Sequence, residues 1–307
     1  MKIKNVMTKV ALLGLMANLA DGAVFRYNTS GDWTQTSNTG SGPAGWGPNP
    51  NNNGVTPGSL PGAGDQARIN WGGNTVTVST AVPTVSRVMI GVDENGNVDV
   101  LSGGVLSSTG NVLAGNNNAA VNNANLFVRD GGTVNVGNIL YSSNNSSTGH
   151  ITIDAGGIVN VGNHLWLGAT KPSMISIGGS LFQTGGILGL GTTNANTPSG
   201  GTATVNILDG GLLSLNNISG GAGLPSIQAG SVIDIQGSGR LVLPGDFTGV
   251  LNNYITANKI IGNGTNGAVS ASFDSNLNQT VVSTIPEPSS ALLLGLAGSF
   301  GFVRRRR

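Results

Sequence analysis

The chain contains no cysteine, so disulfide bridges and thiolate metal sites are excluded. Aromatic residues make up only 5% of the sequence and charged residues only 9%. So few large rings argue against a wide compact core and favour a narrow core of aliphatic side chains. Residues 24–285 carry seven basic and eleven acidic side chains, a net charge of −4. Because nucleic-acid binding needs a basic patch, this balance argues against nucleic acid as a partner.

Glycine is abundant instead, and a Gly-Gly step recurs after alternating apolar runs. The steps are Gly103-Gly104, Gly131-Gly132, Gly156-Gly157, Gly185-Gly186, Gly210-Gly211 and the variant Ser238-Gly239. Three residues before each step stands one large apolar side chain: Val100, Val128, Ile153, Phe182, Ile207 and Ile235. Three residues after it stand Leu106, Val134, Val159, Leu188, Leu213 and Leu241. Stacked coils would share such columns as one continuous core.

This repeat of 25 to 29 residues has no helical period. It predicts an all-β fold, a right-handed parallel β-helix (β-solenoid) with about three short strands per coil, over residues 75–250. A β-sandwich is the alternative, although one register at one spacing favours the solenoid. The repeats resemble autotransporter-associated β-strand repeats, which implies the same architecture.

The segments that flank the repeats are predicted to be caps. Residues 24–74 contain Trp33, Trp46 and Trp71, and an end coil must cover its apolar face and its strand edge. Carbohydrate stacking is the alternative role for these rings. Residues 251–284 are expected to form an irregular C-terminal cap and a polar linker.

The N-terminal residues 1–23 have the pattern of a signal peptide. Three lysines precede the apolar run Val10–Ala20, and small residues follow it. We expect a signal helix that signal peptidase removes, with export of the rest.

The C-terminal residues 285–307 have a second targeting pattern. Pro286-Glu287-Pro288 precedes an apolar segment, residues 291–303, and the basic tail Arg304, Arg305, Arg306 and Arg307. An apolar helix followed by arginines indicates a stop-transfer segment with a cytoplasmic tail, although 13 residues would cover only roughly 20 Å of a ~30 Å hydrocarbon core. The whole segment resembles the PEP-CTERM sorting signal. The resemblance implies recognition by a membrane-embedded exosortase, cleavage near Pro286-Glu287-Pro288, and delivery to the cell surface or extracellular polymer. A plain membrane anchor is the alternative.

Candidates for catalysis are few. His150 and His164 are expected to be surface or turn residues, since neither lies in a catalytic motif. Asp130, Asp154 and Asp209 lie just before Gly-Gly steps, where a β-helix would bring turns together. Such carboxylates can act as general acid and base on polysaccharides, but aspartate before a glycine turn also caps its own backbone. We expect no enzyme activity, with a carbohydrate-active enzyme using Asp130 and Asp154 as the alternative.

Binding motifs are also weak. Residues 93–99 place oxygen-bearing side chains at alternate positions, as Ca²⁺ loops do, but Val98 stands where an EF-hand needs glycine. No metal or cofactor is predicted. An ice-binding face would need a regular threonine array, and the candidates share no register: Thr75, Thr77, Thr152, Thr202 and Thr204. The sequence therefore predicts an exported structural or adhesive protein of the envelope or matrix, with exopolysaccharide as its partner and a glycan- or ice-binding module as the further alternative.

Overall fold

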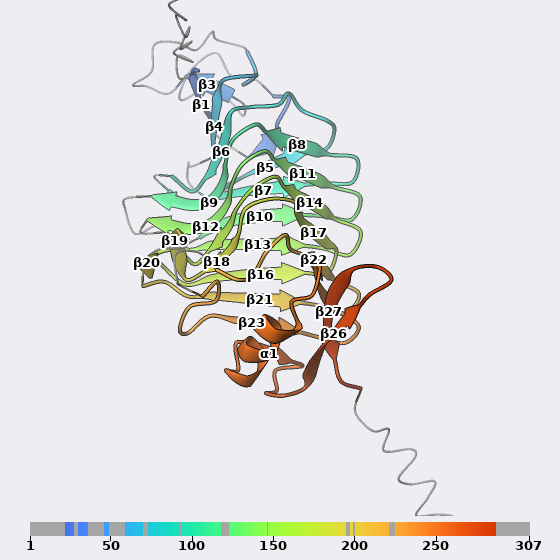
Figure 1. Cartoon of the computed structure of the whole chain (residues 1–307). Coiled ribbons are helices and arrows are strands. Elements are labelled where there is room, and N and C mark those ends of the chain that lie inside the picture. Colours follow the sequence, from blue (N-terminus) through green and yellow to red (C-terminus); the bar gives the residue numbers. More distant parts are fainter. Residues whose placement is uncertain are drawn as a thin grey trace, which may run out of the picture.

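The chain folds into a β-solenoid of about six turns, built mostly from parallel sheets (Figure 1). The computed structural model describes residues 22–27, 30–35, 46–48, 59–69, 73–92, 94–117, 123–145, 147–194, 197–198, 200–220 and 225–286.

Three sheets, here called A, B and C, run along the stack. Sheet A contains, in spatial order, β3 (Trp46–Pro48), β1 (Val24–Tyr27), β4 (Gln66–Ile69), β6 (Arg87–Ile90), β9 (Val112–Asn117), β12 (Leu140–Asn145), β15 (Leu165–Leu167) and β18 (Leu188–Leu190). Sheet B contains β2 (Gly31–Asp32), β5 (Asn74–Val78), β7 (Gly96–Val100), β10 (Ala124–Val128), β13 (Gly149–Ile153), β16 (Ser173–Ile177), β21 (Ala203–Ile207), β23 (Val232–Ile235) and β25 (Ile260–Gly262). Sheet C contains β8 (Val105–Ser108), β11 (Thr133–Val136), β14 (Ile158–Val161), β17 (Ser180–Gln183), β22 (Leu212–Ser214), β24 (Arg240–Pro244), β27 (Gln279–Thr284) and β26 (Val269–Asp274). A small hairpin, β19 (Thr192–Asn194) and β20 (Thr197–Pro198), projects after β18.

One aliphatic column runs through sheet B, as the repeat predicts. Its members lie directly opposite one another on successive strands, and all are fully buried: Val100, Val128, Ile153, Ile177, Ile207 and Ile235. Burying each such side chain contributes about 1.5–3 kcal/mol. The stacked column is therefore a large part of what holds successive coils together.

The predicted place of Phe182 in this column is wrong. The fourth coil turns at Gly178-Gly179, not at Gly185-Gly186, because its turn between sheets B and C is two residues long and not four. Ile177 consequently occupies the column, and Phe182 lies opposite Asn160 on the outer face of sheet C. Leu188, predicted to align with Val159, belongs to sheet A instead.

Left-handed backbone turns form two of the corners. At the corner from B to C, five glycines have φ between 55° and 83°: Gly103, Gly131, Gly156, Gly210 and Gly237. At the corner from A to B, one residue per coil has φ between 55° and 79°: Gly91, Gly115, Ser143, Gly168 and Gly191. Glycine adopts these angles without steric cost, which explains part of the high glycine content. Ser143 is held there by its own hydroxyl, which accepts from the Gly149 amide at 2.7 Å.

Asparagine ladders tie neighbouring coils on the outside. Asn125 donates to the Asn97 side chain at 2.7 Å. Asn160 donates to Asn135 at 2.9 Å, and Asn163 donates to Asn138 at 3.0 Å. Each amide satisfies its neighbour one coil away, so polar outer positions also help to fix the register.

Aromatic packing closes the N-terminal end. Trp33 and Trp46 are fully buried, their ring centroids lie 4.5 Å apart, and the Trp46 indole N–H donates to the Trp33 carbonyl at 2.6 Å. The alternative prediction, that carbohydrate stacks on Trp33 and Trp46, is therefore wrong, since neither ring is accessible to a ligand. Trp71 lies outside the described residues.

The C-terminal end is regular and not irregular. Helix α1 (Thr248–Thr256) buries Leu251 and Tyr254 against the last coil. The hairpin of β26 and β27 then adds two antiparallel strands to sheet C through β24. The polar linker expected before residue 285 is therefore replaced by a paired strand.

Candidate functional site

The sorting motif begins where the last strand ends. Thr284 donates from its hydroxyl to the Gly237 carbonyl at 2.7 Å, and the Ile285 amide donates to the Ala268 carbonyl at 2.8 Å. Pro286 follows directly and borders a hollow of about 560 Å³ that Arg240 also lines. We call residues 283–286 the sorting stem.

Several predicted targeting residues lie outside the described residues. They are the N-terminal residues 1–21, Glu287, Pro288, residues 291–303 and the tail Arg304, Arg305, Arg306 and Arg307.

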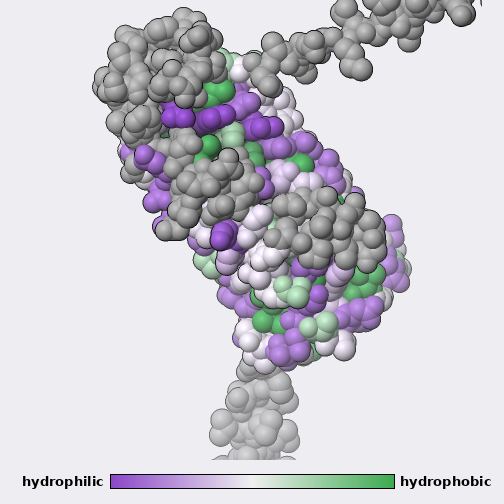
Figure 2. Space-filling model, turned by 90° about the vertical axis from the view of Figure 1, so that its left-hand side faces the viewer, coloured by the Kyte–Doolittle hydropathy of each residue, from purple (hydrophilic) through white to green (hydrophobic). Residues whose placement is uncertain are grey.

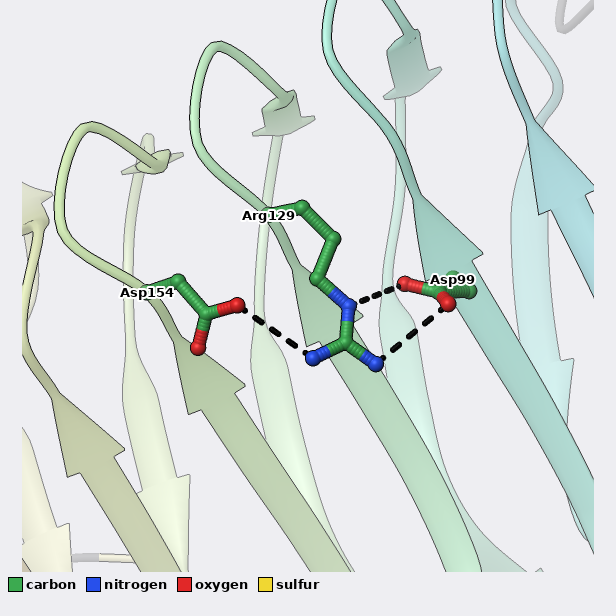
Figure 3. Close-up of polar contacts among 3 residues, drawn as sticks. All are labelled: Asp99, Arg129 and Asp154. Atoms are coloured by element: carbon green, nitrogen blue, oxygen red, sulfur yellow. Dashed lines mark hydrogen bonds and ion pairs between the residues drawn. The ribbon is translucent and has the colours of Figure 1, made fainter.

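The candidate catalytic residues Asp130 and Asp154 make different contacts. Asp154 accepts from Arg129 at 3.2 Å, and Arg129 binds Asp99 with two further contacts at 2.6 and 3.3 Å (Figure 3). These three side chains come from three successive coils, and the guanidinium also lies 4.6 Å from the Phe127 ring centre. The bridging arginine therefore links three coils through charge-assisted hydrogen bonds to Asp99 and Asp154.

Asp130 and Asp209 occupy a different turn position, one residue nearer the glycine. The Asp130 carboxylate lies over Gly156 of the next coil, within 1.9 Å of where a Cβ would stand. Asp209 accepts from the amide and hydroxyl of Ser238 at 2.8 and 2.7 Å, and the Ser238 amide lowers the pKa of Asp209. Both carboxylates therefore lie against the turn of the following coil, a contact between coils that the expected capping of their own backbone does not include.

An aromatic cluster lies on the outer face of sheet A, and the sequence analysis missed it. Tyr141 and Trp166 are register partners on neighbouring strands, with ring centroids 5.2 Å apart. His164 stacks on Trp166 with centroids 4.9 Å apart and planes inclined by 23°. All three rings are partly exposed. Tyr141 and Trp166 are 25 residues apart, which is the length of one coil. This spacing is the sequence feature that indicates their stacking on neighbouring strands.

Sheet B has no threonine array on its outer face. One outer row contains Thr75, Asn97, Asn125, His150, Met174 and Thr204 in order. The other contains Thr77, Asp99, Phe127, Thr152 and Ser176. The outer face of sheet B is therefore chemically mixed and has no regular threonine row. Asn97 and Asp99 of the calcium candidate are engaged by Asn125 and Arg129, and no cluster of potential metal ligands occurs among the described residues.

His164 gives the fold a pH dependence. Burial lowers the pKa of His164 below its ordinary 6.5, so folding favours the neutral ring. Because the pKa of His164 is lower in the folded state than in the unfolded chain, the unfolded chain binds the proton more tightly. The stability that the neutral ring allows is present above the unfolded pKa of about 6.5 and is lost as the pH falls below it. Protonation would also remove the Nδ1 acceptor that the Ile187 amide uses at 3.1 Å.

We therefore expect the free energy of unfolding to fall between pH 7 and pH 5, measured by urea denaturation. Burial also lowers the pKa of His150, so His150→Gln should remove part of the pH dependence as well. His164→Gln should flatten the pH profile relative to wild type. Equal profiles for wild type and His164→Gln would contradict this assignment.

Comparison with known proteins identifies a sorting motif at the C-terminus. Residues 284–307 match the model of the PEP-CTERM protein-sorting motif. No curated protein and no solved structure matches the chain, so the likeness to autotransporter-associated repeats stays a prediction. Within the described part of the chain, no helix has the length and apolar character needed to cross a membrane. The matched motif makes the chain an exported protein that an exosortase processes, directed to the cell envelope or surface.

Proposed function

We propose that the solenoid is a structural and adhesive protein of the cell surface or extracellular matrix, without catalytic activity. The observation that carries the proposal is that outer side chains form contacts between neighbouring coils. The two aspartates nominated for catalysis serve the stack itself, Asp154 through Arg129 and Asp130 over the next turn. Three asparagine pairs on the outer surface also link neighbouring coils.

The surface that remains suits many weak contacts with a polymer. The side of the stack drawn in Figure 2 mixes hydrophilic and hydrophobic residues along its length. Solenoids use such long faces as extended binding surfaces. The partly exposed rings of Tyr141, His164 and Trp166 are the feature best suited to hold a sugar ring, because aromatic faces bury the apolar side of a sugar while its hydroxyls stay wet. Exopolysaccharide is accordingly the proposed partner.

The alternative is a carbohydrate-active enzyme, and it has a direct test. Wild type, Asp130→Asn and Asp154→Asn would be incubated with a panel of acidic and neutral polysaccharides, and product ends would be counted. We expect no turnover by any of the three. Depolymerisation by wild type that both variants lose would overturn the structural assignment.

Adhesion is tested by binding to exopolysaccharide purified from the native host. Trp166→Ala should weaken binding roughly tenfold, the loss typical of a central aromatic contact. Phe182→Ala is the matched control, because Phe182 is an outward-facing ring on sheet C. Equal binding by wild type and both variants would exclude the aromatic cluster, and equal weakening would indicate no specific site.

A further inference from the structure

The strand that leads into the sorting motif is paired on both sides. β27 lies between β24 and β26 in sheet C and is antiparallel to both. Ser283, near its end, lies opposite Arg240 on one side and opposite Ser270 on the other. Thr284 still lies opposite Val269. The chain thus stays inside a hydrogen-bonded sheet until two residues before Pro286.

The contacts continue up to the motif itself. The Thr284 hydroxyl and the Ile285 amide each donate to a backbone carbonyl, at Gly237 and Ala268. Pro286 borders a hollow. Its other walls come from the last two turns between sheets B and C, from β24 and from β27: Gly210, Gly237, Ser238, Arg240, Ser283 and Thr284. No spacer therefore separates the folded body from the motif, at the pole where Figure 1 places β26 and β27.

An enzyme that processes a peptide must hold several residues in an extended form, with their backbone groups available for pairing. The residues immediately before Pro286 have those groups already engaged within the body. Strand ends open locally at low free-energy cost, so release of a few residues is feasible without unfolding the stack.

From this geometry we propose that the sorting stem acts as a latch, meaning a paired segment that must detach from the body before the motif can be processed. Thr284 must leave sheet C and the Ile285 amide must release the Ala268 carbonyl before the exosortase can hold the motif. The pole formed by β24, β26 and β27 is then the surface that faces the enzyme. The proposal rests on the sorting motif and not on the adhesive function, so a failure of glycan binding would leave it intact. The rate of processing is then set partly by opening of the stem.

A spacer tests this directly in the native host. The full chain would carry eight Gly/Ser residues between Ile285 and Pro286, and the matched control would carry the same insert in the hairpin turn between Asn276 and Leu277. Loss of the C-terminal segment would be followed by pulse-chase labelling and mass spectrometry. We expect the first insert to speed processing roughly tenfold, the factor that net loss of two hydrogen bonds produces. The turn insert should leave the rate unchanged.

A point variant and a cross-link give independent readouts. Thr284→Ala removes the bond to Gly237 and should speed processing severalfold, whereas Thr265→Ala removes an exposed hydroxyl contact in the same cap and should not. Cysteines at Val269 and Thr284, which lie directly opposite, would close the latch, since the chain has no other cysteine. The disulfide should block processing, and reduction or the spacer before Pro286 should restore it.

Each outcome decides the question. Processing of the cross-linked chain at the wild-type rate would show that the stem need not open. An equal gain from both inserts would show that chain length and not the latch is limiting. Absence of processing in every chain, wild type included, would also contradict the proposal, because the motif would then not be used.

Discussion

Replacing Gly168 with alanine is expected to lower the free energy of unfolding by about 3 kcal/mol, among the largest losses for a single methyl group in this chain. Gly168 turns the chain from sheet A to sheet B with φ of 62°, a left-handed conformation that costs an alanine roughly 1–2 kcal/mol. Its Cβ would also lie 2.0 Å from the Thr202 carbonyl oxygen of the next coil. Backbone cannot move aside as a flexible side chain can, so the two neighbouring coils would have to separate.

Gly210 provides the matched control for Gly168. It has φ of 76°, but a Cβ there would meet nothing within 4 Å. Gly210→Ala should therefore cost only the conformational part, roughly 1–2 kcal/mol. Urea denaturation of both variants separates backbone strain from coil contact. Equal losses would show that the close approach of Gly168 to Thr202 has no role in stability.

Truncation of Ile153 to alanine is expected to cost about 3 kcal/mol, because it removes a fully buried side chain and leaves a cavity. Ile153 lies between Val128 and Ile177 in the column of sheet B, so the cavity would weaken contacts with two neighbouring coils. The same measurement on Thr152→Ala, whose side chain points outward from the same strand, should give a change below about 0.5 kcal/mol. A small loss for Ile153→Ala would mean that this column is not the core.

The column was largely predictable from sequence because each coil repeats one alternating run before one glycine turn. Val100, Val128, Ile153, Ile207 and Ile235 all hold the predicted places. The fourth coil was misread because two Gly-Gly pairs follow two alternating runs there, seven residues apart. Only the shortened turn at Gly178-Gly179 distinguishes them, and the repeat pattern does not give turn length.

The surface was less predictable. Arg129 reaches Asp99 diagonally, because Phe127 and not Arg129 lies opposite Asp99, and a diagonal contact has no counterpart in the repeat spacing. Asp154 occupies the same place as Arg129 in the next coil, but the repeat does not show that the two side chains meet. The single glycines at the corner from A to B escaped notice because they are not doubled as those at the other corner are. The C-terminal hairpin was missed because its run of small and polar residues resembles a linker, and only antiparallel pairing with β24 makes it a strand.

The arrangement of the fourth coil is the most direct test of stacking in one register. Methyl and aromatic proton contacts measured by nuclear Overhauser spectroscopy on the labelled protein would show which side chain neighbours Ile153. The structure predicts contacts from Ile153 to Val128 and to Ile177, with none to Phe182. Contacts from Ile153 to the Phe182 ring, with Ile177 absent, would contradict the register and the solenoid built on it.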